Sequence, residues 1–129
     1  MNRHRIASFS QESTRYCNYG KEQFDNGVTF IKPCFWENGS VRYNLWARYC
    51  QAAEEPYLAL ITTGSSPQEA RSVLPNSTKT EIVITANPRE WLHIFDLRCA
   101  ESAHPQMREL MRPMRAAFIA KWPSIFGSS

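Results

Sequence analysis

The chain has 129 residues, of which 43% are hydrophobic and 21% charged, and this composition is typical of one globular domain. It excludes a collagen-like or largely disordered chain, and no apolar run approaches the roughly 18 residues that a membrane span needs. Fifteen Lys and Arg against twelve Asp and Glu give a net charge of +3, a mild bias toward anionic ligands. Residues 1–129 are predicted to form a single domain. Without an apolar leader or a CxxC pair, a cytoplasmic protein with reduced thiols is expected.

The first half of the chain is predicted to contain one long helix. Residues 19–40 are expected to be loop with a short strand at 28–31, where β-branched and aromatic residues gather. From about Asn44 to Thr63 the apolar side chains recur at helical spacing, and Gly64 follows where a helix C-cap would stand.

The second half is predicted to alternate short helices with a strand. Ser66-Pro67-Gln68-Glu69 is a helix start signal, and Pro75 ends that helix after one or two turns. Residues 80–85 alternate and are β-branched, which predicts a strand. Asn87-Pro88-Arg89-Glu90 opens a further helix, and Pro105 another. The sequence therefore predicts an α+β fold, a helix-rich domain with a small mixed sheet.

The densest group of polar side chains lies between residues 3 and 16. It comprises Arg3, His4, Arg5, Ser8, Ser10, Gln11, Ser13 and Arg15. Guanidinium groups match phosphate oxygens two at a time, so this segment could form a cradle for phosphate or another planar anion. The alternative is a solvated basic arm.

Three further arginines, Arg71, Arg89 and Arg98, are candidates for anion binding. Arg89 falls in the first turn of a predicted helix, where a cation opposes the helix dipole unless an anion compensates. Arg98 could instead be an ion-pair partner of Asp96 or Glu101. The histidines lack metal-ligand spacing and no Gly-rich phosphate loop occurs, so neither a metal site nor a Rossmann site is expected.

Two blocks of this sequence resemble a known family. RHRIASFSQESTRY, residues 3–16, resembles the signature RHRxxSxxxxSxRY of the flavin-dependent thymidylate synthases. ARSVLPNSTKTEIVITANPREWLHIFDLR, residues 70–98, is similar to the AR-VLP, strand, N-x-R and LR segments of that family. The blocks stand in the family's order, and the resemblance covers nearly the whole chain.

The resemblance implies an FAD-dependent methyltransferase that converts dUMP to dTMP with methylenetetrahydrofolate and NADPH. It implies dUMP contacts for Arg3, Gln11, Glu12, Ser13, Thr14, Arg15, Arg71, Leu97 and Arg98. It implies FAD contacts for Arg3, His4, Arg5, Gln11, Asn87, Pro88, Arg89 and His93. Arg98 is expected to be catalytic, because a fixed guanidinium can stabilise negative charge on the uracil ring without proton transfer. Ser13 is expected to bind phosphate and not to act as a nucleophile.

One departure from the family concerns the start of the chain. In the family the RHR motif follows a long N-terminal segment, whereas here it begins at Arg3. We therefore expect a split synthase completed by a separate N-terminal half, a fragment that assembles as a homo-oligomer such as the family's tetramer, or a truncated product inactive alone. Alternatives are a non-catalytic nucleotide-binding or assembly module, a dUMP hydroxymethylating relative, and a basic arm for nucleic acid. Neither nucleic acid nor a membrane is the expected partner.

Overall fold

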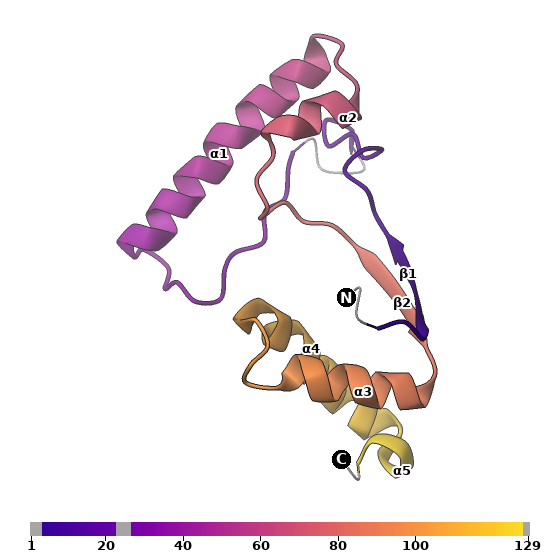
Figure 1. Cartoon of the computed structure of the whole chain (residues 1–129). Coiled ribbons are helices and arrows are strands. Elements are labelled where there is room, and N and C mark those ends of the chain that lie inside the picture. Colours follow the sequence, from indigo (N-terminus) through magenta and orange to yellow (C-terminus); the bar gives the residue numbers. More distant parts are fainter. Residues whose placement is uncertain (1–3, 23–26, 128–129) are drawn as a thin grey trace. The chain divides into compact units, whose positions relative to one another are not determined.

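The computed structural model describes residues 4–22 and 27–127, and helices predominate in it (Figure 1). The elements in chain order are β1 (Ala7–Gln11), α1 (Val41–Thr62), α2 (Pro67–Ala70), the 3-10 turn η2 (Arg71–Val73), β2 (Ile82–Ala86), α3 (Pro88–Cys99), α4 (Pro105–Lys121) and α5 (Pro123–Phe126). β1 and β2 form a small antiparallel sheet. The predicted class, a helix-rich α+β fold with a small sheet, is confirmed. None of the described helices is long and apolar enough to cross a bilayer.

The chain divides into two compact units, and each is described by itself. Unit 1 comprises Met1–Ser10 and Val83–Ser129, and unit 2 comprises Gln11–Ile82. The expectation of one domain over residues 1–129 stays a prediction.

The core of unit 2 forms around the C-terminal half of α1. Tyr57 on α1 is fully buried, and its hydroxyl donates to the Cys17 carbonyl at 3.2 Å and accepts from the Tyr19 amide at 3.2 Å. One phenol thus satisfies two buried backbone groups of a loop that lies far from α1 in sequence. The remaining buried members of this core are Val28 and Ala70.

The ends of α1 are fixed by local chemistry. The Ser40 hydroxyl accepts from the Tyr43 amide at 3.2 Å, so the helix begins at Val41, slightly earlier than the predicted start. At the other end Gly64 has a φ of +98°, and its amide donates to the Ile61 carbonyl. This left-handed cap is what the glycine at this position predicted.

Two predictions for unit 2 have different outcomes. The Ser66-Pro67 start signal is confirmed, because α2 begins at Pro67 and the Glu69 carboxylate accepts from the Ser66 amide at 2.8 Å. The strand expected at 28–31 is reduced to an isolated antiparallel bridge between Phe30 and Thr78. The Ile31 amide donates to the Ser77 carbonyl at 2.7 Å and the Lys79 amide to the Thr29 carbonyl at 2.8 Å, so the pairing among the described residues is limited to this bridge.

Unit 1 is held together by aromatic packing of α3 against α4 and α5. Ile94, Phe95, Met111 and Phe126 are its buried residues. Phe118 lies edge-on to Phe95 with ring centroids 5.2 Å apart, a favourable arrangement for two rings. This packing fixes one face of α3 and leaves its other face available to carry polar side chains.

Candidate functional site

A buried histidine links two charged side chains in unit 1. His4 is only 2% exposed, and its Nδ1 lies 3.1 Å from Glu90 Oε1. The Nε–H of Arg98 donates to His4 Nε2 at 3.0 Å. A guanidinium has no acceptor, so Nε2 carries no proton and Nδ1–H must donate to the Glu90 carboxylate. The three residues therefore form a directed chain from Arg98 through neutral His4 to Glu90.

The electrostatics of this cluster favour the neutral imidazole. Burial lowers the pKa of His4 below its ordinary value of 6.5, and the positive charge of Arg98 lowers it further. The hydrogen bond to Glu90 acts in the opposite direction but does not reverse the shift. His93, whose ring centroid lies 5.7 Å from that of His4, also lowers the pKa.

The start of α3 positions Glu90 for this contact. Asn87 is the N-cap, and its side-chain oxygen accepts from the Glu90 amide at 2.9 Å. The Glu90 carboxylate faces His4, although the sequence pattern placed it in a capping motif. Arg98 lies two turns further along α3 and is half-buried, and its terminal nitrogens have no hydrogen-bond partner among residues 4–22 and 27–127.

The residues expected along the flavin occupy the exposed side of α3. Arg89, His93 and Leu97 are four residues apart and exposed, so they share one helix face. Pro88 is the first helical residue and is also exposed. Their donors and apolar surface fit a planar heterocycle that carries carbonyl and phosphate groups.

The first residues of the chain only partly match the expected roles. Arg3 lies outside the described residues, and Arg5 is exposed. Both ring nitrogens of His4 are already engaged, so its ring fits the part of a support for Arg98 better than that of a direct flavin ligand. Ala7–Gln11 form β1, and four of its five residues are exposed, so the alternative of a solvated basic arm stays a prediction.

The predicted dUMP loop lies in unit 2 beside a hollow of about 310 Å³. The hollow is lined by Gln11, Glu12, Ser13, Thr14 and Thr80. One end of the loop is fixed because the Glu12 amide donates to the Glu81 carbonyl at 2.8 Å. The Gln11 side chain donates to Thr80 Oγ1 at 3.3 Å, which ties the loop to the same neighbouring segment.

Two arginines stand at the other end of this loop. Arg71 Nη1 donates to Thr14 Oγ1 at 3.3 Å, and Arg15 Nε donates to the Gln68 side-chain oxygen at 3.0 Å. The Ser13 hydroxyl accepts from the Arg15 amide at 3.3 Å. Neither arginine has an acidic partner among the described residues. Two uncompensated guanidiniums beside two hydroxyls are an arrangement that binds a phosphate group.

The two sets of predicted residues thus belong to different units. Gln11–Arg15 and Arg71 are brought together in unit 2, and His4, Arg98 and the exposed face of α3 lie in unit 1. The alternative role of Arg98, an ion pair with Asp96 or Glu101, is wrong. Glu101 pairs instead with Arg108 and Arg112, and the Arg98 side chain donates to His4.

Sequence reasoning missed two contributors. The first is Glu90, which shares a helix face with buried Ile94 and with Arg98. A carboxylate at a position that faces the core is unusual, and this signal could have identified Glu90 from the sequence. Gln68 showed no such signal, because an amide in the first turn of a helix is ordinary.

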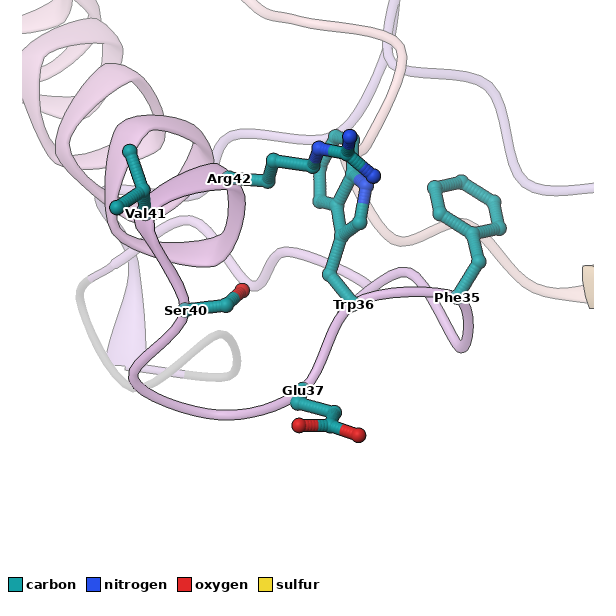
Figure 2. Close-up of a pocket in the computed structure, with 6 residues that line it drawn as sticks. All are labelled: Phe35, Trp36, Glu37, Ser40, Val41 and Arg42. Atoms are coloured by element: carbon teal, nitrogen blue, oxygen red, sulfur yellow. The ribbon is translucent and has the colours of Figure 1, made fainter.

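Another hollow, in unit 2, contains none of the predicted residues. It has a volume of about 360 Å³ and lies where the loop enters α1, lined by Phe35, Trp36, Glu37, Ser40, Val41 and Arg42 (Figure 2). Phe35 and Trp36 meet edge-on with centroids 5.0 Å apart, and the Glu37 carboxylate points away from them. We assign it no role.

These features define an α+β chain with a loop that carries two arginines and two hydroxyls, and with a further arginine held by a buried histidine. The family whose model matches, thymidylate synthase complementing protein, covers residues 1–124. The chain therefore belongs to this family, which confirms the resemblance seen in the sequence.

Named relatives give the same result. The chain is 37% identical over 124 residues to the flavin-dependent thymidylate synthase of Geobacter sulfurreducens, a match that covers 96% of this chain and 52% of that protein. It is 38% identical over 108 residues to the flavin-dependent thymidylate synthase of Pyrococcus horikoshii, covering 84% of this chain and 44% of that protein. The chain spans about half the length of the curated relatives that it matches.

Proposed function

We propose that this chain forms part of a flavin-dependent thymidylate synthase that converts dUMP to dTMP. The observation that carries the proposal is the family match over residues 1–124, together with relatives of that name at 37% and 38% identity. Methylenetetrahydrofolate would supply the carbon and NADPH the reducing equivalents, with FAD as the cofactor.

The loop of unit 2 is proposed to hold the nucleotide phosphate. Arg15 and Arg71 would supply charge, and the Ser13 and Thr14 hydroxyls would donate hydrogen bonds. The existing bonds to Gln68 and Thr14 support this, because they hold both guanidiniums beside the loop before a ligand arrives. Gln11 and Glu12 would border the same nucleotide, as would Arg3.

Arg98 is proposed as the catalytic residue. When a uracil ring reacts at C5, negative charge develops toward N3 and O4, and a fixed cation stabilises it without moving a proton. The hydrogen bond from Arg98 Nε to His4 supports this role, because it fixes the plane of the guanidinium and leaves the terminal nitrogens for the ring. Leu97, exposed beside it, would contact the apolar part of the pyrimidine.

Bound FAD would supply hydride, as reduced flavins do. The exposed face of α3 would hold the flavin through Asn87, Pro88, Arg89 and His93. Arg5, which follows His4 in the sequence, would be a further flavin contact. No protein nucleophile is needed in this scheme. This agrees with the surroundings of Ser13. Its hydroxyl oxygen accepts from the Arg15 amide, and no side chain among the described residues is hydrogen-bonded to it as a general base.

The working enzyme is proposed to be an assembly, either a homotetramer or a complex with a chain that supplies the N-terminal half of the family's sequence. We propose the cytoplasm as its location. All four cysteines are free, as thiols are in a reducing compartment.

The proposal is tested by purifying the chain alone and with the product of the neighbouring reading frame. A yellow protein with flavin absorbance that releases tritium from C5-labelled dUMP is the expected result. Arg98→Gln should lower the rate by about 100-fold or more, as loss of a charge-stabilising donor does. Arg112→Gln is the matched control, because Arg112 pairs with Glu101 on the surface of α4 and should leave the rate unchanged.

A different outcome would favour the binding-module alternative. If every preparation is colourless and releases no tritium, yet dUMP raises the melting temperature, the enzyme proposal is wrong and the phosphate loop alone is retained. Methyl and hydroxymethyl transfer are distinguished by identifying the nucleotide product by mass.

A further inference from the structure

Glu90 is a carboxylate that no step of the proposed function uses. It is only 8% exposed, and acidic side chains are rarely so buried unless a partner compensates them. That partner is the His4 ring, whose Nδ1 lies 3.1 Å from Glu90 Oε1. Glu90 therefore belongs to the buried side of α3 and not to the exposed face that is proposed to hold the flavin.

The contact between Glu90 and Arg98 is indirect. Both side chains bind the same imidazole, Glu90 at Nδ1 and Arg98 at Nε2, and no ion pair joins the two directly among residues 4–22 and 27–127. A direct pair between a carboxylate and a guanidinium is frequently bidentate and then occupies nitrogens of the arginine that could bind a ligand. The interposed neutral ring holds only the Nε of Arg98, so the terminal nitrogens keep their donors for another group.

The carboxylate is the group that permits only one arrangement of protons. An ionised carboxylate accepts and never donates, so His4 must present Nδ1–H to Glu90 and an unprotonated Nε2 to Arg98. A neutral amide at this position could turn its NH2 group toward Nδ1, and the ring proton would then move to Nε2. Two donors would meet there, and the guanidinium would have to turn away. The acid of a Ser-His-Asp triad selects a histidine tautomer in the same way.

We propose that Glu90 is a positioning residue for the reaction, which fixes the direction of the Arg98 guanidinium through the proton on His4 Nδ1. The inference rests on the role proposed for Arg98, and it adds a residue that touches neither the nucleotide nor the flavin. Its effect falls on the chemical step, because the nucleotide phosphate is proposed to be held in unit 2 by Arg15 and Arg71. Loss of Glu90 should therefore lower kcat and leave the affinity for dUMP almost unchanged.

The same contacts predict how the rate responds to acid. Among the described residues, the ionisable side chains that act on the His4 ring are Glu90, His93 and Arg98, all on α3. Burial lowers the pKa of His4, the hydrogen bond to Glu90 raises it, and Arg98 and His93 lower it. Protonated His4 would carry Nε2–H toward Arg98, so kcat should fall only below pH 6.5, as the ring takes up its proton. Without the carboxylate the pKa of His4 falls further, so Glu90→Gln should move this acid limb to lower pH.

The test compares Glu90→Gln and Glu90→Asp in the assembly that releases tritium from labelled dUMP. Glutamine has the shape of glutamate without its charge, whereas aspartate keeps the carboxylate on a shorter side chain. Glu90→Gln should lower kcat by about tenfold or more, as loss of one charge-assisted hydrogen bond does, and change the dissociation constant of dUMP by less than about twofold. Glu90→Asp should stay closer to wild type. Glu109→Gln, the same change at an exposed position of α4, should have no effect.

A second measurement needs neither activity nor a variant. NMR of the wild-type chain with isotope-labelled histidine should show the His4 proton on Nδ1, and Glu90→Gln should give a second form with the proton on Nε2. A wild-type proton on Nε2 overturns the proposal, as does an unchanged kcat in Glu90→Gln. If Glu90→Gln is more active than Glu90→Asp, shape alone matters and the proposal is also wrong. An inactive wild-type assembly overturns the proposed function and this role with it, whereas the NMR result shows separately whether the arrangement of protons holds.

Discussion

The neutral state of His4 makes a prediction about stability against pH. Burial holds the pKa of His4 below 6.5 in the folded chain, whereas the unfolded chain has the ordinary value. The unfolded state therefore binds a proton first as the pH falls, and the folded state loses stability below 6.5. One pH unit below that value, proton binding to an unfolded histidine costs the folded state at most about 1.4 kcal/mol.

The assay is urea unfolding of the wild-type chain and of His4→Gln across this pH range. Glutamine can accept from Arg98 and donate to Glu90 but does not titrate, so the variant should lose less stability on acidification. The difference between the two curves isolates His4, because His93, His104 and the carboxylates are present in both. Parallel curves would refute the assignment of a neutral, buried imidazole. So would an NMR titration in which the His4 ring takes up its proton at 6.5.

Three other predictions concern the phosphate loop, the core and the thiols. Arg71→Gln should weaken dUMP binding by about tenfold or more, measured by calorimetry, because one charge-assisted bond to phosphate is lost; unchanged affinity would exclude Arg71 from the site. Tyr57→Phe should lower the free energy of unfolding by about 1–3 kcal/mol in urea titrations, since its hydroxyl bonds two backbone groups in a fully buried position. Exposed Cys34 should react first with a thiol reagent, while Cys17, whose pKa burial raises to about 11, should react only on unfolding; equal rates would contradict this burial.

The elements predicted well from sequence are those that local chemistry defines. Ser66-Pro67 and Asn87-Pro88 each combine an N-cap residue with a proline at the first helical position, and α2 and α3 begin where they indicate. Gly64 ends α1 because few residues other than glycine adopt its positive φ. None of these signals depends on a distant part of the chain.

The elements that were missed depend on distant partners. β1 was interpreted only as a basic segment, because Ala7–Gln11 becomes a strand by pairing with β2, which follows some seventy residues later. Residues 28–31, in contrast, have the composition of a strand, but only Phe30 among them forms a bridge. Strand identity is set by the partner as much as by the residues themselves, so single-sequence reasoning failed in both directions.

The candidate site shows the same division. The arginines and hydroxyls could be chosen from residue type alone, since anion binding requires few other groups. The support behind Arg98 could not, because His4 and Glu90 are 86 residues apart in sequence and only folding brings them together.

The arrangement of Glu90, His4 and Arg98 explains how a histidine can lie against a guanidinium in a buried place. If the imidazole were charged, Nε2 would carry a proton toward the Arg98 Nε–H, and two donors would meet without an acceptor. Only the neutral ring with its proton on Nδ1 can satisfy both neighbours, and the Glu90 carboxylate selects that tautomer. The charge of Glu90 also balances that of Arg98 through the ring. The cluster thus keeps one positive charge fixed in direction, which a flexible arginine on an exposed helix face could not do.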